Sequence, residues 1–508
     1  MLNSLKASIK DTFIFGFGNV AVKLIGLILI PLYTDPKYFS IDDFGIIGML
    51  DISGMVLIAL ITSSIPQSLT RWYWAKDQKE NQKSIFFMSF ISQLVLSLFF
   101  CFILIPLASP LSIVLFKNTN WEAAIILIII SSALQSVNNI VNSLLRLQTR
   151  SMTFMVTNLA KLVIVLLLTI YFIVFRKMGV EGIYLAQVFG NALIILTLLP
   201  YTFRNITPRF DLATWKPMIS YGIPLAIASV ATVMLNVVDR YALNSIALLK
   251  YVAVYTLAVK ISSTLKLVVV DTIKLAVFPQ MIKRVDSEEN KTFYPHVMLY
   301  SSFVVMFGIV GVSLFSLEAI KLLSKTPELW TASMLIPLLS VSMFFVNMRE
   351  ISIYGLVAAK KTGRISLIVF ISALLNIILN ILLVPSWNAT GSALASLLSQ
   401  FFYWYLLHFI AQKTYFVPYE NKRLLTVFIL GSLLSFSGLL LTEIDLLPRL
   451  AIKFLLLLSF PVLLYFVGFY KESEIRVFKG FVSKWSNLRK IRENLRSFKD
   501  IKDDVFVE

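Results

Sequence analysis

The chain has 508 residues, of which 58% are hydrophobic and only 15% charged, and its formal net charge is +18. A soluble protein of this length needs roughly 25% charged residues to cover its surface, so the composition excludes a set of soluble domains and indicates a protein surrounded largely by lipid. A single cysteine, Cys101, excludes an intramolecular disulfide framework and a cysteine-based zinc site. With only two histidines, His296 and His408, we expect no catalytic residues, no metal site and no cofactor.

Apolar stretches long enough to cross a membrane recur along the whole chain. A helix crosses the ~30 Å hydrocarbon core with about 20 mostly apolar residues. The sequence predicts fourteen such spans, at 12–33, 45–66, 84–108, 122–146, 153–175, 180–202, 218–239, 251–276, 295–318, 330–357, 364–384, 390–412, 424–442 and 448–470. Because the runs are continuous and do not alternate with period two, they exclude a β-barrel. The predicted fold class is an all-α integral membrane protein of about fourteen transmembrane helices, without a large extramembrane domain.

The lysines and arginines of the loops predict the orientation. If the N-terminus is cytoplasmic, the basic residues concentrate in one inner loop after another and in the C-terminal tail, as the positive-inside rule requires. Both termini are therefore expected in the cytoplasm. Topology also explains the net charge of +18, so nucleic-acid binding need not be invoked. No A-x-A cleavage site follows the first apolar run, so we expect span 1 to be a retained anchor.

The first two spans each carry one charged residue at mid-depth. In span 1 one helical face carries Gly16, Asn19, Lys23 and Gly26, at spacings of three and four. In span 2 Asp51 shares a face with Gly48 and Met55. An ionisable group within a span is costly unless it faces a cavity or a partner. Lys23 and Asp51 lie at similar depths, so a buried ion pair and a role in a cavity are both open.

Span 4 carries a polar stripe along one face, made of Gln135, Asn138, Asn142 and Arg146. Polar groups that face hydrocarbon are expensive, so this face is expected to meet water, substrate or another helix. Hydrogen bonds between helices alone could account for the asparagines. We favour a lining of the cavity because Arg146 ends the stripe. In span 5, Lys161 is shallow enough to extend to the inner interface.

Spans 8 and 10 supply further charges. Lys260, Asp271 and Lys274 lie within about 60° of one another around the predicted helix of span 8. Span 10 holds Arg349 beside Glu350, which either neutralise each other or contribute to a cavity. Over all spans cations exceed acids, which suits an anionic cargo in a region of low dielectric. Alternatively, Asp51 and Asp271 serve coupling to a cation or proton.

Two segments near the membrane surfaces have separate interpretations. Asp239-Arg240, at the outer end of span 7, is predicted to be an interfacial, locally paired dipeptide. The tail, 471–508, alternates apolar and basic residues at helical spacing. This pattern predicts an amphipathic basic helix on the anionic inner leaflet, or a surface for a cytoplasmic partner.

An internal repeat organises the chain. Residues 179–186 recur as 388–395 at an offset of 209, and the inner loop at 146–150 corresponds to 360–364 at a similar offset. An even number of spans between the copies keeps them parallel, with an axis along the membrane normal. We therefore predict an N-terminal lobe at 1–203, a C-terminal lobe at 204–412, two added helices at 413–470 and the tail. The repeat nominates Tyr33, Thr34, Arg240 and Tyr241 as an outer gate; chance resemblance between apolar helices is the alternative.

Short motifs support a family resemblance. They are the segment 13–19 with Gly16 and Gly18, Ile30-Pro31-Leu32-Tyr33-Thr34, Phe44-Gly45, the segment 221–225 with Gly222 and Pro224, Asp239-Arg240-Tyr241 and Val254-Tyr255. The chain resembles bacterial polysaccharide (O-antigen) flippases of the multidrug/oligosaccharidyl-lipid/polysaccharide exporter superfamily over spans 1–12. This resemblance implies an alternating-access carrier for undecaprenyl-diphosphate-linked oligosaccharides, with two lobes around a V-shaped central cavity. It also implies a location in the bacterial cytoplasmic membrane, contact with membrane lipids, and association with a polysaccharide polymerase or biosynthesis complex.

Three classes of function remain. A flippase predicts short loops, a basic cavity and no nucleotide motif, and the sequence meets all three. A cation-coupled multidrug antiporter of the same superfamily predicts twelve spans and cavities dominated by acids. A membrane glycan polymerase, ligase or glycosyltransferase predicts a large outer loop or an acidic or histidine catalytic cluster, and the sequence has neither. It also has no G-x-x-x-x-G-K-[ST] run for ATP use. We favour the flippase.

Overall fold

The computed structural model describes residues 26–75, 80–274, 277, 281, 290–359 and 361–476, and within these ranges it is helical with no strand. The all-α membrane fold is therefore confirmed. Lys23, most of span 1 and the basic tail beyond residue 476 lie outside the described residues, so the interpretations given to them remain predictions.

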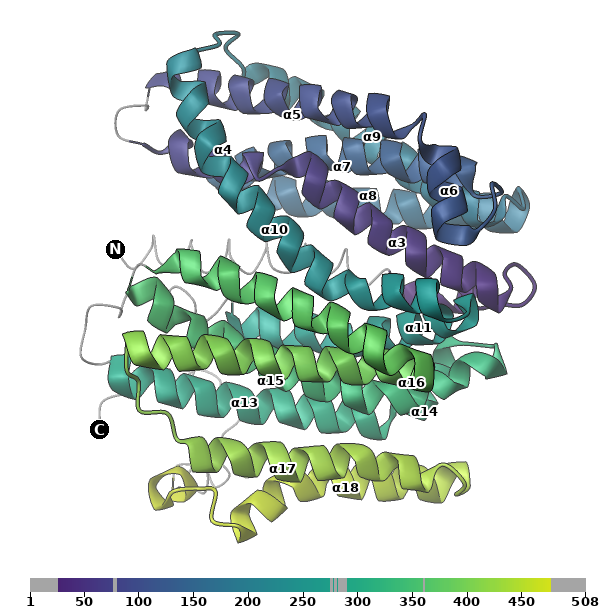
Figure 1. The fold of residues 1–508 in the computed structure, drawn as a ribbon, viewed down its shortest axis with the longest axis vertical. Helices are drawn as coiled ribbons and strands as arrows, with labels where there is room; N and C mark the ends of the chain where they lie inside the picture. The colour runs from purple at the N-terminus through teal and green to yellow at the C-terminus, as the bar shows by residue number, and fades with distance from the viewer. Residues whose placement is uncertain are drawn as a thin grey trace, which may run out of the picture.

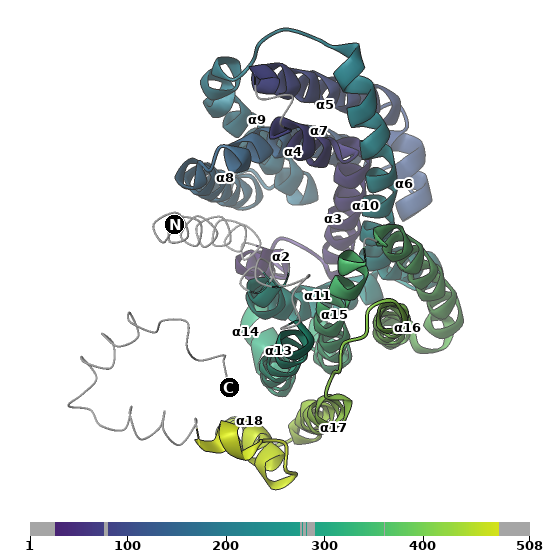
Figure 2. The same ribbon diagram turned by 90° about the vertical axis from the view of Figure 1, so that its left-hand side faces the viewer.

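The helices form two bodies with a diagonal helix between them (Figures 1 and 2). The first body contains α3 (Ile41–Thr62), α4 (Ile65–Tyr73), α5 (Gln82–Leu104), α6 (Ala108–Phe116), α7 (Glu122–Leu147), α8 (Ser151–Ile170), the π-helix η2 (Tyr171–Phe175) and α9 (Gly179–Arg204). The second contains α11 (Leu249–Leu265), the π-helix η3 (Lys266–Val270), α13 (Asn290–Leu314), α14 (Ser316–Leu323), η4 (Pro327–Met334), α15 (Leu335–Ala358) and α16 (Thr362–Thr414). The diagonal helix is α10 (Leu212–Ile246), and the short α2 (Ile30–Tyr33) lies beside α11 and α14 in Figure 2.

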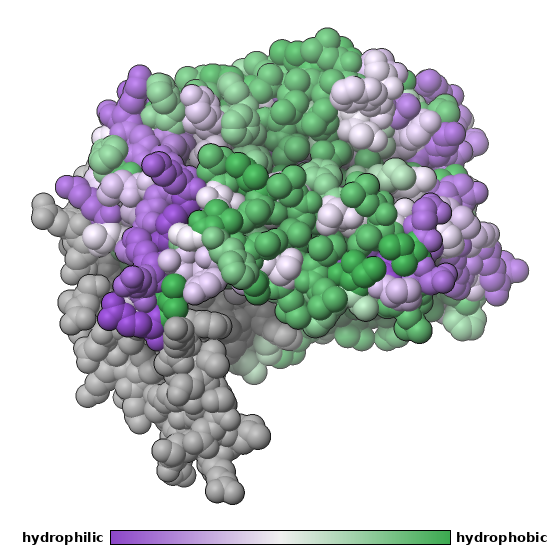
Figure 3. Space-filling view, turned by 90° about the horizontal axis from the view of Figure 1, so that it is seen from below, coloured by the Kyte–Doolittle hydropathy of each residue, from purple (hydrophilic) through white to green (hydrophobic). Residues whose placement is uncertain are grey.

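Twelve helices in the described part are long and apolar enough to cross a membrane. One of them, Gly363–Thr414, has 52 residues and contains two of the expected spans on either side of a kink. The count of fourteen is thus not confirmed and remains a prediction. In Figure 3 a hydrophobic band crosses the middle of one face, with hydrophilic residues toward both ends, as a membrane belt requires.

The kink in α16 has a local cause. Pro385 removes one backbone hydrogen bond of the helix, and Asn388 adopts φ 46° and ψ −126°, outside the helical region. Gly391 then lies so close to the preceding turn that a side chain there would overlap Leu383. The absence of a side chain at Gly391 is what allows the chain to turn back within three residues.

The last two helices, α17 (Asn421–Ser437) and α18 (Leu446–Phe466), flank the second body. Gly431 of α17 packs directly on Met306 of α13. At the end of the bundle where α14 lies, Glu318 of α14 binds Arg449 and Lys453 of α18, each at 2.8 Å, and both cations are almost fully buried. The added helices are therefore fixed to the second body by packing and by a buried ion cluster.

Candidate functional site

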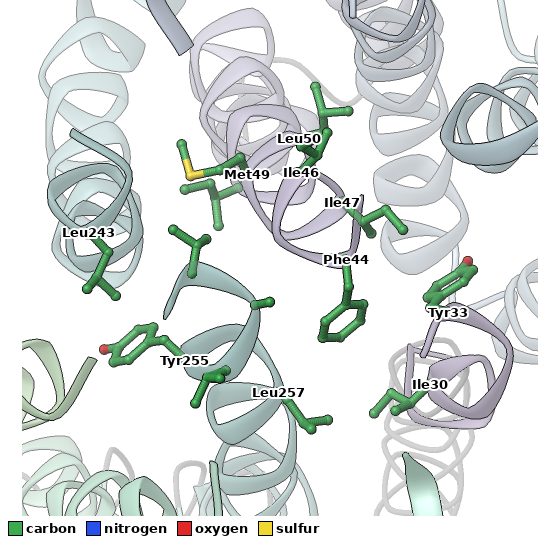
Figure 4. Close-up of a cluster of buried hydrophobic side chains, with 14 of the residues drawn as sticks. Ile30, Tyr33, Phe44, Ile46, Ile47, Met49, Leu50, Leu243, Tyr255 and Leu257 are labelled. Atoms are coloured by element: carbon green, nitrogen blue, oxygen red, sulfur yellow. The ribbon is translucent and has the colours of Figure 1, made fainter. Parts of the chain in front are cut away.

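The two bodies meet near one end of the bundle, which we call the α6 end because α6 and the starts of α3 and α11 lie there (right-hand side of Figure 1). One hydrophobic core joins side chains of α2, α3, α7 and α9 to those of α10, α11 and α15. Figure 4 shows part of it, with Tyr33 and Phe44 on one side and Tyr255 and Leu257 on the other. The bodies are therefore closed against each other at this end.

Two glycines let α3 approach α11 closely within this core. A side chain at Gly45 would come within 2.6 Å of the Leu249 carbonyl oxygen, and one at Gly48 would overlap the Thr256 hydroxyl. Contact of this kind excludes water and brings groups farther along both helices within reach of each other.

An ion pair between the bodies lies one to two turns deeper. Lys260 Nζ of α11 is 3.2 Å from Asp51 Oδ2 of α3, and the two side chains are 19% and 32% exposed. Tyr184 of α9 donates a hydrogen bond to the other carboxylate oxygen at 3.3 Å. The Lys260 ammonium also lies 5.8 Å from the ring centre of Tyr33 and 5.7 Å from that of Phe44, where aromatic faces stabilise a cation.

Further polar contacts close the α6 end. Tyr241 of α10 shares a hydrogen bond of 2.9 Å with Ser53 of α3. Asn244 of α10 donates to the Leu115 carbonyl of α6 at 2.6 Å. Thr326, between α14 and η4, donates to the Thr34 carbonyl at 2.7 Å, and nearby Lys325 binds Asp35 at 2.6 Å. Thr34 and Tyr241, which the repeat nominated as opposing gate residues, thus both lie in this closed region but contact other partners.

The polar stripe of α7 is used mainly within the first body. Asn138 is 2% exposed and donates to the side chain of Asn191 in α9 at 3.1 Å. Gln135 accepts a hydrogen bond from Lys161 of α8 and donates to Asn139. Arg146 is exposed at the end of the helix, with its guanidinium over the ring of Phe154. Lys161 does not extend to the interface as expected, because Gln135 offers its ammonium an acceptor within the membrane.

Asn142, the remaining member of the stripe, is partly buried, and its side-chain oxygen has no hydrogen-bond partner among the described residues. It is therefore the position in the stripe where a ligand or water would satisfy an unmet group.

Lys274, which follows the π-helix η3, and the charges of α15 form a second cluster toward the other end. Glu350 binds Lys274 at 2.6 Å and Arg349 at 2.9 Å, and Arg349 also donates to Gln400 of α16 at 3.0 Å. Lys274 and Glu350 line a small pocket with Asn347.

Lys260 and Lys274 were expected on one face, but the π-helix η3 lies between them. A π-turn changes the angular spacing of the residues, and the two lysines contact different helices, α3 and α15. Asp271, three residues before Lys274 in the sequence, is partly buried.

The prediction for Asp239-Arg240 was wrong. Asp239 is 4% exposed and accepts hydrogen bonds from Tyr255 at 2.6 Å, from Asn380 at 2.9 Å and from Ser396. Arg240 is 8% exposed, and it donates to the Asn236 carbonyl at 3.4 Å. The dipeptide is therefore buried between α10 and the second body, where neutral donors of α11 and α16 bind the carboxylate. The overlooked signal is in α16, where Asn376, Asn380, Ser392 and Ser396 form two i, i+4 pairs.

The sequence profile of the family described as "Polysaccharide biosynthesis protein" matches residues 8–285, more than half of the chain. The chain belongs to this family. The match covers α3–α11 and therefore both partners of the Asp51–Lys260 pair. A search of curated protein sequences finds no significant match.

Solved structures share the fold of this polysaccharide biosynthesis family member at low identity. The lipid II flippase MurJ in an inward closed conformation is 14% identical, with a TM-score of 0.67 over 92% of this chain and 99% of that chain. A multidrug resistance MATE family transporter of the MOP superfamily is similar in its outward-facing form (14% identity, TM-score 0.62, 83% of this chain and 96% of that chain). The inward-facing MATE form is also similar (13% identity, TM-score 0.62, 80% of this chain and 98% of that chain). These likenesses show that the chain shares the fold of the flippase and of the MATE family transporter.

Proposed function

We propose that the protein is a flippase that moves a lipid-linked oligosaccharide, carried on undecaprenyl diphosphate, across the bacterial cytoplasmic membrane by alternating access. Both termini are cytoplasmic in this proposal, so the α6 end faces outward, and the closed contacts there correspond to a carrier open toward the cytoplasm. Membership of the polysaccharide biosynthesis family supports a glycan-related cargo. The fold supports a transporter whose two bodies move against each other.

One observation carries the proposal: a lysine lies where the two bodies meet, far enough along α11 to be expected near mid-membrane depth. Lys260 is eleven residues, or about 16 Å of helix rise, from the start of α11. It is bound to only one carboxylate oxygen in the described structure, although an ammonium group has three donors. A diphosphate head group carries the negative charge and the acceptor oxygens that such a site would bind.

Arg349 and Lys274 extend this cationic character toward the cytoplasmic end, with Glu350 between them. We assign them, together with Asn142 and Arg146 of α7, to the path that the head group and sugars follow. We also propose the division into lobes at 1–203 and 204–412, since the bodies of Figures 1 and 2 fall on either side of α10.

The proposal is tested with the purified full chain in liposomes. A fluorescent short oligosaccharide on polyprenyl diphosphate is placed in both leaflets, and a membrane-impermeant quencher or glycosidase reports its movement. We expect movement well above that of protein-free liposomes, and no acceleration of the same oligosaccharide on a neutral polyprenyl ether. Equal rates with and without protein would contradict the proposal. Proton-driven or sodium-driven export of cationic drugs by the same liposomes would instead support the antiporter function.

A further inference from the structure

We propose that the phosphate group of the cargo replaces Asp51 as the partner of Lys260, so that cargo binding itself unlocks the α6 end. The inference rests on the proposed function and deepens it, because it separates two residues that would otherwise both count as cargo ligands. Lys260 binds the cargo, whereas Asp51 is an internal competitor for the same ammonium group.

The position of the pair supports this division of roles. Asp51 lies on α3 of the first body and Lys260 on α11 of the second, with 3.2 Å between the charged atoms. The pair therefore adds a bond that exists only while the bodies are together at this end. Both side chains remain partly exposed, at 32% and 19%, so a ligand can approach them without unfolding the core.

The chemistry supports replacement rather than simple addition. Asp51 and a phosphate both offer anionic oxygens to one ammonium group, and the two anions repel each other at close range. Tyr184 donates to Asp51 Oδ1 and also to the Ile47 carbonyl, both within the first body. Asp51 therefore keeps a neutral partner on its own side after Lys260 is taken, which lowers the cost of breaking the pair.

Replacement also explains why binding would open the carrier. A ligand shifts a conformational equilibrium only if it binds one state better than the other. Phosphate competes with Asp51 while the α6 end is closed and is free of that competition once the bodies have separated there. Cargo with a diphosphate therefore binds the open state more tightly, whereas a lipid without a phosphate leaves the Asp51–Lys260 ion pair intact.

The chain offers a matched control. Asp35 and Lys325 form a second ion pair at the α6 end, between the α2–α3 connection and the α14–η4 connection. Lys325 is 66% exposed, so this pair lies at the surface, away from mid-membrane depth. Asp35→Asn weakens contacts at the same end without touching the group that we assign to phosphate.

The experiment measures opening and binding in the same variants. Spin labels at Asn120→Cys, between α6 and α7, and Glu328→Cys, in η4, lie on exposed positions of the two bodies. They are attached to the full chain carrying Cys101→Ser, in nanodiscs, with polyprenyl diphosphate or neutral polyprenol as probe. Binding is followed separately by displacement of a fluorescent polyprenyl diphosphate.

In the parent protein we expect polyprenyl diphosphate, but not polyprenol, to lengthen the label distance. Asp51→Asn should be open without ligand and bind the diphosphate about tenfold more tightly, a coupling of the usual size between linked sites. Lys260→Gln should be open without ligand but bind weakly and show no response. Asp35→Asn should keep the response to ligand.

Three results decide the matter. If polyprenyl diphosphate binds the parent protein but leaves the label distance unchanged, the replacement is wrong while the flippase proposal stands. If Asp51→Asn binds the diphosphate more weakly than the parent, Asp51 is a ligand and not a competitor, and the inference fails. If polyprenyl diphosphate binds no better than polyprenol, the proposed function fails and the inference fails with it.

Discussion

Lys260 follows Asp51 by 209 residues, and the two side chains meet at 3.2 Å. The same offset of 209 relates residues 179–186 to 388–395, including Gly182 and Gly391, each of which permits a close approach of backbone or side chain at its turn. The predicted repeat relates the two halves by a two-fold axis, and equivalent positions can touch each other only beside such an axis. On this prediction, the pair lies at the centre of the contact between the two halves.

The orientation of the chain is accessible to cysteine labelling. In a Cys101→Ser background, Asn118→Cys lies in the exposed α6–α7 connection and Arg204→Cys at the exposed end of α9. We expect an impermeant maleimide to label Asn118→Cys in intact cells and Arg204→Cys only after the cells are opened. The reverse pattern would invert the topology and make the α6 end cytoplasmic.

The buried cluster of Glu318 with Arg449 and Lys453 is expected to stabilise the attachment of α18. Glu318→Gln leaves two buried cations without a counter-charge, a change that typically costs about 3–5 kcal/mol. The melting temperature in detergent should fall clearly. Glu443→Gln, at an exposed position of the same end, removes the same charge and should melt like the parent protein. Equal melting of both variants would show that the cluster adds nothing to stability.

A pH dependence is expected where the segment after α18 returns to the bundle. Burial raises the pKa of Glu474, but hydrogen bonds from Tyr300 and Arg423 lower it more, so the net shift is downward. Burial likewise raises the pKa of Glu420, and its bonds to Lys471 and Arg423 outweigh that effect. Depressed carboxylate pKa values stabilise the attachment above the ordinary glutamate pKa, and this stabilisation is lost as the pH falls through the lowered values.

Hydrogen exchange of residues 471–476 measures this attachment. Protection should be constant from pH 7 to about pH 5 after correction for intrinsic exchange, and should fall below about pH 4, near the unperturbed glutamate value. Glu474→Gln should show low protection already at pH 7. Strong protection of this variant at pH 7 would mean that packing, including that of Arg423 on Phe469, holds the segment without the charges.

The membrane fold could be predicted from the sequence because lipid imposes long apolar runs, and these are visible without any tertiary information. The pairing of charges could not. Asp51 was expected to face Lys23 or a cavity, and its described partner is Lys260, which a helix-by-helix analysis treats separately. Asp51 and Lys260 are equivalent positions at the offset of 209. Equivalence alone does not predict a contact, because two equivalent positions need not lie beside the predicted axis.

Local irregularities explain other differences. The π-helix η3 interrupts the regular spacing that placed Lys260 and Lys274 on one face. Asn138 binds Asn191 in a neighbouring helix. The hydropathy of the sequence cannot distinguish such a bond between helices from a side chain that lines a cavity. Asp239-Arg240 was predicted to lie at the membrane surface because it stands near the end of an apolar run. The neutral donors of α16 bind the Asp239 carboxylate and so lower the free-energy cost of burying it.

The kink of α16 gives a prediction about backbone conformation. Asn388 has φ 46° and ψ −126°, a sparsely populated backbone conformation that costs a non-glycine residue about 1–3 kcal/mol. Asn388→Gly should preserve folding and melting temperature, whereas the β-branched Asn388→Val should lower both. Gly391→Val should be more damaging because its side chain would overlap Leu383. Membrane yield and thermal melting of the three variants provide the measurement, and an undiminished Gly391→Val protein would contradict the tight turn.

The role of Lys260 is measured by the rate at which liposomes carrying Lys260 variants translocate the oligosaccharide on polyprenyl diphosphate. In the proposed function the cargo requires a positive charge at this position, and bidentate geometry is optional. Lys260→Arg should therefore retain part of the rate, and Lys260→Ala should lose most of it at equal protein content. Lys325→Ala, which removes an exposed cation of the α6 end, should remain close to the parent. If Lys260→Ala translocates the cargo as fast as the parent protein, a cation at the junction of the two bodies is not what moves the diphosphate.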